Sequence, residues 1–186
     1  MMAAGKRRSS RQSRKGRLFL ALLIVLAVAF MINNLYVVKS VQVVGNSRRT
    51  ADEIIARSGI SMGMSILKLD DALIRSGVEA DPYLELRQVI RRYPSAVELV
   101  VEERKACAAI SNAGVIALID AGCRVLEVID RLPDSQVIMV TGVAAVSRRV
   151  GYRLESQTPA QVNHLEMVLT AINAHNASGL ISELNI

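Results

Sequence analysis

The longest uncharged stretch of the chain runs from Leu18 to Val38, and it constrains the fold more than any other feature. As an α-helix rising about 1.5 Å per residue, this stretch would reach about 30 Å, the thickness of the hydrocarbon core of a bilayer. A buried core helix fits less well because no polar face interrupts the run, and a cleaved signal peptide is a further alternative because Ala27–Ala29 resembles a cleavage site. The apolar run continues past that site, so we interpret residues 18–38 as an uncleaved transmembrane helix.

The positive charge of the chain is concentrated before this stretch. Residues 1–17 contain seven of the 23 basic residues and no acidic residue, whereas the other 16 basic residues nearly balance 17 acidic residues. Lys and Arg beside a membrane span stay on the cytoplasmic side, so we expect a cytoplasmic N-terminus and extracytoplasmic C-terminal domains. The leader has no apolar period, which predicts disorder, and no aromatic residues among its charges, which disfavours a nucleic-acid-binding tail.

Residues 38–106 have the pattern of a small two-layer domain. Apolar and polar residues alternate in three segments, the last two joined by a tight turn at Tyr93–Ser95, and this alternation predicts strands. The predicted strands are 38–44, 83–92 and 96–103. A sheet of this size needs a covering layer on its apolar face.

Two short helices are predicted between the first two of these strands. Thr50 and Glu53 form a capping-box pattern that opens one helix, while Asp70 or Asp71 caps a second helix that ends at Gly77. Neither helix is long enough to be stable alone in water, so both must pack on the sheet. The order is therefore β-α-α-β-β, with two helices on one face of a three-stranded sheet.

Strand patterns dominate residues 107–186. We expect three strands joined by two turns over 107–129, a linker containing Pro133, a strand at 137–140 and an amphipathic helix opened by Thr158 and Pro159. The final residues, 180–186, again alternate. Because such a strand needs a neighbour, we expect either that the natural chain continues beyond Ile186 or that the strand pairs with another molecule.

No catalytic or metal-binding constellation is evident in the sequence. His164 and His175 lie about 16 Å apart on the predicted helix, too far to share a metal ion, and Cys107 and Cys123 have no nearby ligands. The thiols are expected at different ends of a strand ladder, which disfavours a disulfide although an extracytoplasmic location permits one. We predict that the chain is not an enzyme and binds no cofactor, metal or small-molecule substrate.

The adjacent carboxylates of Glu102 and Glu103 do not form a catalytic pair either. Neighbouring residues of a strand face opposite ways, so the two side chains cannot act as a general acid and base on one substrate. We expect solvated charges and a junction salt bridge with Arg104 or Lys105.

Exposed sheet edges are then the chain's main means of binding. An extended segment of another protein can add to an edge strand through main-chain hydrogen bonds, with alternate side chains selecting the partner. Covered or simply solvated edges are the alternative. The predicted contact residues are Val41, Val43, Leu84, Leu86, Leu184 and Ile186.

Several short motifs, taken in order, resemble one known family. They are Val41–Asn46, Asp81–Leu84, Arg91–Pro94, Val97–Arg104 with Ala108, Asp120 with Gly122, Val125 and Leu126, and Leu132–Pro133 with Gly142. Together with the basic leader and the apolar stretch, they resemble the FtsQ/DivIB cell-division family, whose members have a cytoplasmic tail, one span, a POTRA domain and a β-rich domain.

The resemblance implies an α+β fold: a disordered tail (1–17), a transmembrane helix (18–38), a POTRA-like domain (38–106) and a β-rich domain (107–186). The family normally continues with more strands, which implies that the last domain is C-terminally truncated. It further implies a bitopic scaffold of septum assembly in the cytoplasmic membrane. That scaffold would recruit FtsL-type and FtsB/DivIC-type bitopic division proteins at the division septum. A membrane-tethered POTRA chaperone for secreted or outer-membrane polypeptides is the alternative function.

Overall fold

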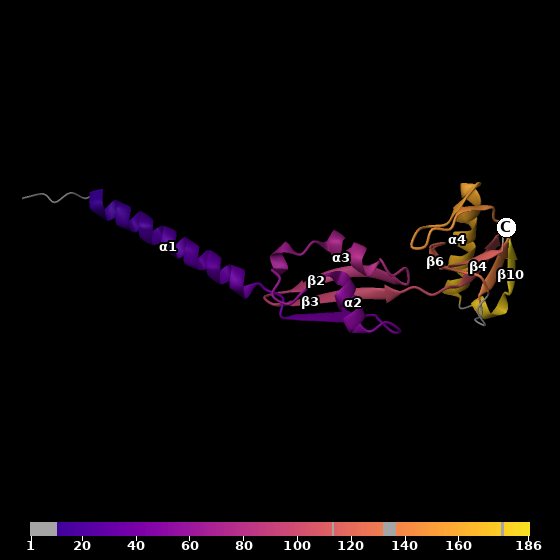
Figure 1. Cartoon of the computed structure of the whole chain (residues 1–186), viewed down its shortest axis with the longest axis horizontal. Helices are drawn as coiled ribbons and strands as arrows, with labels where there is room; N and C mark the ends of the chain where they lie inside the picture. The colour runs from indigo at the N-terminus through magenta and orange to yellow at the C-terminus, as the bar shows by residue number, and fades with distance from the viewer. Residues whose placement is uncertain (1–10, 113, 132–136, 176) are drawn as a thin grey trace, which may run out of the picture.

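The computed structural model describes residues 11–112, 114–131, 137–175 and 177–186. A long N-terminal helix is followed by two small domains that lie one after the other along the longest axis of the molecule (Figure 1). Both domains combine helices with β-sheet, so the predicted α+β class is confirmed for the part of the chain outside the N-terminal helix.

Helix α1 (Arg11–Leu35) begins inside the leader that the sequence predicted to be disordered. The basic residues and Gln at this end are good helix formers, and they extend a helix that the apolar run already nucleates, so the prediction is wrong for residues 11–17. Large apolar side chains are exposed along the helix from Leu18 to Leu35. Among the described residues, no helix has the combination of length and hydropathy that a membrane crossing requires.

The helix also ends earlier than the apolar run. Val38, predicted as the last residue of a span, is only 1% exposed and lies in the core of the first domain. Its N–H donates to the carbonyl of Met64 and its carbonyl accepts from Gly63, while Val37 pairs with Ser65. Backbone hydrogen bonds therefore join residues 36–38 to the first domain, while the N–H of Tyr36 still donates to the carbonyl of Ile32 in α1 at 3.1 Å.

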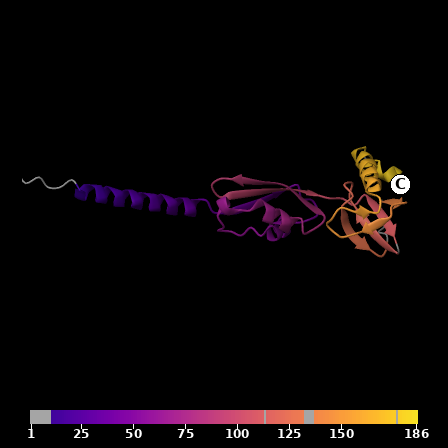
Figure 2. The same cartoon turned by 90° about the horizontal axis from the view of Figure 1, so that it is seen from above.

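The first domain contains the predicted β-α-α-β-β order. Its strands are β1 (Ser40–Val44), β2 (Leu84–Arg92) and β3 (Ala96–Glu103). The strand order is β1-β3-β2, with β3 parallel to β1 and antiparallel to β2, so β1 and β2 are both edge strands. Figure 2 shows the helices on one face of this sheet.

Helices α2 (Ala51–Ser58) and α3 (Asp71–Val78) begin where the caps predicted. Thr50 and Glu53 form a complete capping box, and the Asp70 carboxylate accepts from two N–H groups of the first turn of α3. Helix α3 continues past its predicted end at Gly77 to Val78. Gly77 packs against α2, where a Cβ would lie 2.2 Å from the carbonyl oxygen of Arg57. A short 3₁₀ helix, η1 (Ile66–Lys68), lies between α2 and α3.

The core of the first domain is formed by side chains from the sheet, both helices and the segment after α1. Its buried members are Val38, Ile54, Ile60, Ile66, Ile74, Val78, Leu84, Leu86, Val97, Leu99 and Val101.

The second domain is built on a five-stranded sheet with the order β10-β7-β4-β5-β6. As predicted, the first three strands form an antiparallel meander and a fourth follows the linker; Pro133 itself lies outside the described residues. The strands are β4 (Ala108–Asn112), β5 (Val115–Ile119), β6 (Val125–Ile129), β7 (Ile138–Thr141) and β10 (Glu183–Asn185), with a small pair β8 (Ala145–Ser147) and β9 (Glu155–Ser156).

Helix α4 (Pro159–Ala174) is the predicted amphipathic helix, and Val162, Leu165 and Leu169 bury its apolar side in the second core. It is followed by a 3₁₀ turn, η2 (Ser178–Leu180). Strand β10 pairs in parallel with β7, so the terminal strand finds its neighbour within the chain. The alternative in which this strand needs another molecule as its neighbour is corrected, because the edge of β7 pairs with it. The expected continuation of the natural chain beyond Ile186 stays a prediction.

Candidate functional site

The β1 edge has the geometry that strand addition needs. Val41 and Val43 are half-buried and pack against the first core, so their side chains face inward. Gln42 and Val44 are exposed, and Val44 is the more apolar of the two. The two predicted valines therefore hold the strand on its domain, and a partner would meet the backbone of β1 and the exposed residues Gln42 and Val44.

The β2 edge is closed at Leu86, near the start of the strand, by side chains from α3 and its C-cap residue. The N–H of Leu86 donates to Oε1 of Glu79 at 3.2 Å, and the carbonyl of Leu86 accepts from the guanidinium of Arg75. Arg75 and Glu79 also form an ion pair at 2.8 Å along α3. A bulge between Leu86 and Gln88 interrupts the strand further. An added strand would have to displace all of these interactions.

The predicted contact residues of β2 lie in the core. Leu84 and Leu86 are 1% and 0% exposed, because the apolar face of β2 is the one that the helices cover. They cannot meet a partner without unfolding of the domain. The i, i+4 spacing of Arg75 and Glu79 was visible in the sequence, but that they reach the Leu86 backbone depends on the packing of α3 on β2.

The β10 edge lies at the far side of the second sheet. Leu184 and Ile186 are half-buried against the second core, while Glu183 and Asn185 are exposed. The N–H of Ile186 donates to the carbonyl of Thr141 at 3.1 Å, which continues the pairing with β7 beyond the strand. The predicted residues thus lie on an edge strand with their side chains directed toward the core.

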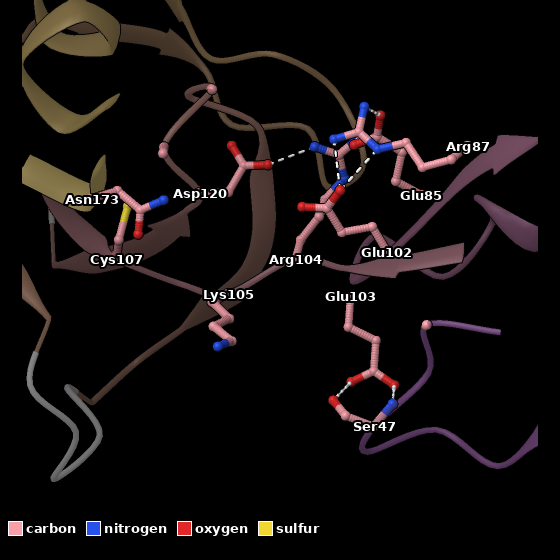
Figure 3. A pocket seen from close by; sticks show the side chains of 13 residues that line it. Ser47, Glu85, Arg87, Glu102, Glu103, Arg104, Lys105, Cys107, Asp120 and Asn173 are labelled. Carbon is pink, nitrogen blue, oxygen red and sulfur yellow. Dashed lines mark hydrogen bonds and ion pairs between the residues drawn. The ribbon is translucent and has the colours of Figure 1, made fainter. Parts of the chain in front are cut away.

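A ladder of alternating charges crosses the junction between the two domains (Figure 3). Glu102 pairs with Arg87 at 2.8 Å, Arg87 with Glu85 at 2.6 Å, Glu85 with Arg104 at 2.6 Å, and Arg104 with Asp120 at 2.8 Å. Asp120 belongs to the second domain and its side chain is only 8% exposed. Arg104 therefore ties the two domains together through a largely desolvated ion pair.

The salt bridges at the junction join other residues than the sequence analysis predicted for Glu102 and Glu103. Arg104 pairs with Glu85 and Asp120, whereas Glu102 pairs with Arg87. The prediction considered only sequence neighbours, but residues adjacent in a strand point apart and find partners on neighbouring strands.

Glu103 is held by the loop after β1. Its carboxylate accepts from the N–H groups of Ser47, Arg48 and Arg49 at 2.7, 2.8 and 2.9 Å, and from the Ser47 hydroxyl at 2.8 Å. Burial alone would raise the pKa of Glu103, but the backbone donors of Arg49, Ser47 and Arg48 outweigh it and lower the pKa to about 2. Successive N–H groups that converge on one anion fix this loop in place.

A cavity of about 500 Å³ lies at the junction, lined by these charged side chains together with Lys105, Cys107 and Asn173. Beside the junction, the hydroxyl of Tyr83 donates to Glu127 of the second domain at 3.0 Å. Partial burial and then this hydrogen bond raise the pKa of Tyr83 to about 12. The lining carboxylates Glu85, Glu102, Glu103 and Asp120 are engaged by donors of the protein itself, so the arrangement is that of a structural joint.

The structure places the cysteines and histidines that the sequence analysis considered as follows. Cys107 and Cys123 form no disulfide, and burial raises the pKa of their thiols to about 11 and about 12. His164 is exposed on α4, and His175 is exposed at the C-cap position directly after it. Within the described ranges, no group of three or more metal-binding side chains comes together.

Comparison with known proteins gives consistent results. Residues 37–104 match the family described as POTRA domain, FtsQ-type. The chain is 24% identical over 151 residues to the cell division protein DivIB of Clostridium acetobutylicum, covering 80% of this chain and 59% of that protein. It is 34% identical over 90 residues to the cell division protein FtsQ of Bradyrhizobium diazoefficiens, covering 48% of this chain and 26% of that protein.

A further relative is the cell division protein FtsQ of Caulobacter vibrioides, which is 30% identical over 107 residues, or 58% of this chain and 35% of that protein. The chain thus spans between about a quarter and three fifths of the length of these curated relatives. The matched POTRA range, 37–104, agrees with a first domain that begins directly after α1 and ends at Arg104.

Proposed function

We propose that this chain, which belongs to the FtsQ/DivIB family of cell division proteins, acts as a bitopic membrane scaffold in bacterial septum assembly. The observation that carries the proposal is the FtsQ-type POTRA domain over residues 37–104, in a chain whose curated relatives are named cell division proteins. The joint between the domains, in which carboxylates and cations engage one another, suits a protein that holds others in position.

The anchor of this scaffold is the apolar part of α1. Support comes from the absence of charge between Leu18 and Val38 and from the exposure of large apolar side chains, such as Leu18 at 71% and Phe30 at 72%. Exposed apolar side chains along a helix are stable in lipid and costly in water. The basic leader then remains in the cytoplasm, and both domains lie on the extracytoplasmic side.

The proposed partners are FtsL-type and FtsB/DivIC-type bitopic division proteins, bound through sheet edges. The β1 edge is favoured over the β2 edge because Arg75 and Glu79 already occupy the backbone of Leu86. The β10 edge is the corresponding candidate in the second domain. Main-chain pairing supplies the affinity in this mode of binding, and exposed side chains of the edge strand supply the selectivity.

Localisation tests the scaffold role. A fluorescent fusion of the chain is expected to form a band at midcell in dividing cells of its host. An even distribution around the membrane, in cells that otherwise divide normally, would contradict the role. A tethered chaperone, the alternative function, is not favoured because the relatives are division proteins; it would capture many extended clients in a pull-down, whereas a scaffold captures a few defined proteins.

A matched pair of substitutions tests the choice of edge. Gln42→Lys places a charge on exposed β1, and Gln88→Lys places the same charge on exposed β2. A Lys on an edge strand discourages strand addition. We expect Gln42→Lys to reduce co-purification of FtsL-type or FtsB/DivIC-type partners and Gln88→Lys to leave it unchanged. Equal effects of the two substitutions would reject β1 as the binding edge.

A further inference from the structure

Three segments of the first domain meet at the end from which α1 leaves (Figure 1). They are the stretch after α1 (36–39), the loop with η1 (61–68) and the turn between β2 and β3 (93–95). The N–H of Ile66 donates to the carbonyl of Tyr36 at 3.0 Å, and the N–H of Lys39 donates to the carbonyl of Ser95 at 2.8 Å. The rings of Tyr36 and Tyr93 contact edge to face, with their centroids 5.8 Å apart.

Large apolar side chains point outward from two of these segments. Met62 is 64% exposed, Met64 44%, Leu67 56% and Tyr93 56%. The loop that carries the first three is held firmly, because Ile66 is fully buried and the backbone of Val38 bonds to both Gly63 and Met64. Because this loop is fixed, its apolar side chains cannot turn inward. Their exposure to water is unfavourable unless another molecule covers them.

Unpaired positive charge accompanies this apolar surface. Lys39 and Lys68 are exposed, and neither has an ion-pair partner in the part of the chain that the structure describes. The nearby carboxylates are engaged, since Asp70 caps α3 and Asp71 pairs with Arg91 at 2.6 Å. Apolar and aromatic side chains with lysines at their margin match the boundary between acyl chains and anionic headgroups.

We propose that Met62, Met64, Leu67 and Tyr93, here called the juxtamembrane surface, lie in the headgroup region of the bilayer in which α1 is anchored. The inference rests on the proposed anchor, because Tyr36 directly follows the last residue of α1 and bonds to the loop itself. A surface joined to the helix end by one hydrogen bond lies within a few residues' reach of the membrane. The occupant of the surface is therefore lipid, and the contact limits how the first domain tilts relative to the bilayer.

The absence of Trp from the sequence permits a direct test. Three single-Trp variants of the full chain are reconstituted in phosphatidylcholine vesicles with a minority of phosphatidylglycerol, with or without lipids brominated near the headgroup end of the acyl chain. Leu67→Trp reports the juxtamembrane surface, Phe30→Trp reports α1, and Leu180→Trp, at a position 87% exposed in the second domain, is the control. All three positions are exposed, so each variant is expected to fold, which circular dichroism verifies.

We expect brominated lipid to quench the fluorescence of the Leu67→Trp variant by about twofold or more, since an interfacial side chain lies about 5–10 Å into the headgroup and acyl boundary. The Phe30→Trp variant should be quenched as well, and the Leu180→Trp variant should be unaffected. Quenching of Phe30→Trp without quenching of Leu67→Trp overturns the juxtamembrane surface and leaves the anchor intact. Quenching of neither overturns the anchor and the surface with it, and equal quenching of all three variants overturns the specific contact.

Discussion

The contact between Glu103 and the loop after β1 leads to the sharpest prediction. Its carboxylate accepts from three successive backbone N–H groups, those of Ser47, Arg48 and Arg49, as well as from the Ser47 hydroxyl. Glu103→Gln removes the charge while keeping one carbonyl oxygen as an acceptor. A hydrogen bond to a charged group contributes ~1.5–3 kcal/mol, and the site is partly solvated, so we expect the free energy of unfolding to fall by about 2 kcal/mol.

The predicted loss depends on pH in a defined direction. Glu103 has a pKa of about 2 in the folded protein, whereas a free Glu titrates near about 4.3, as expected for the unfolded chain. A lowered pKa in the folded state stabilises the protein above the unfolded pKa, and this contribution is lost as pH falls through the folded pKa. The difference between wild type and Glu103→Gln should therefore be full above about pH 5 and largely absent near about pH 2.

Thermal unfolding of the detergent-solubilised chain, followed by circular dichroism between neutral and acidic pH, measures this difference. Glu102→Gln is the matched control, because the Glu102 side chain is 60% exposed and pairs only with Arg87 among the described residues. Its substitution should cost less than about 1 kcal/mol, as exposed ion pairs do. If Glu103→Gln costs no more than Glu102→Gln at neutral pH, or if its cost does not shrink in acid, the reasoning about the loop is refuted.

Three further predictions concern the junction and the cores. Arg104→Gln should destabilise the chain by about 3 kcal/mol and speed proteolysis between the domains, because two carboxylates lose their shared cation; unchanged cleavage would contradict this. Gly45→Ala should cost at least about 2 kcal/mol in urea unfolding, since φ is +94° and its Cβ would lie 2.0 Å from the carbonyl oxygen of Val101. The thiol of Cys123, which is fully buried and has its pKa raised to about 12, should react with a thiol reagent at about pH 8 only after denaturation; rapid labelling of Cys123 in the native chain would refute its burial.

Local signals in the sequence predicted most of the elements. The capping box at Thr50, the Asp70 cap and the alternation in β2 and β3 act within a few residues, so their outcome could be read without the fold. The leader was a harder case: its composition predicted disorder, yet the helix reaches back to Arg11 because helix propagation depends on the neighbouring segment.

For the candidate contact residues, too, the sequence predicted the local pattern but not the tertiary surroundings. Alternation predicted correctly that Val41 shares a strand face with Val43 and that Leu184 shares one with Ile186, but not whether that face meets a partner or the protein's own core. For Leu84 and Leu86 the answer is the core, because α2 and α3 cover that face of the sheet. A period-2 pattern specifies two faces of a strand without saying what lies against each.

The sequence by itself determined the order of strands and helices in the first domain and the place of the POTRA domain, because propensities, caps and alternation operate over a few bonds. Only the tertiary structure decided which sheet edge is closed and which partners the junction charges choose. Arg75 and Glu79 reach Leu86, Glu103 reaches the loop after β1, and Arg104 reaches Asp120 across a domain boundary. Each of these contacts joins residues distant in the sequence, and their hydrogen bonds form only after the chain has folded.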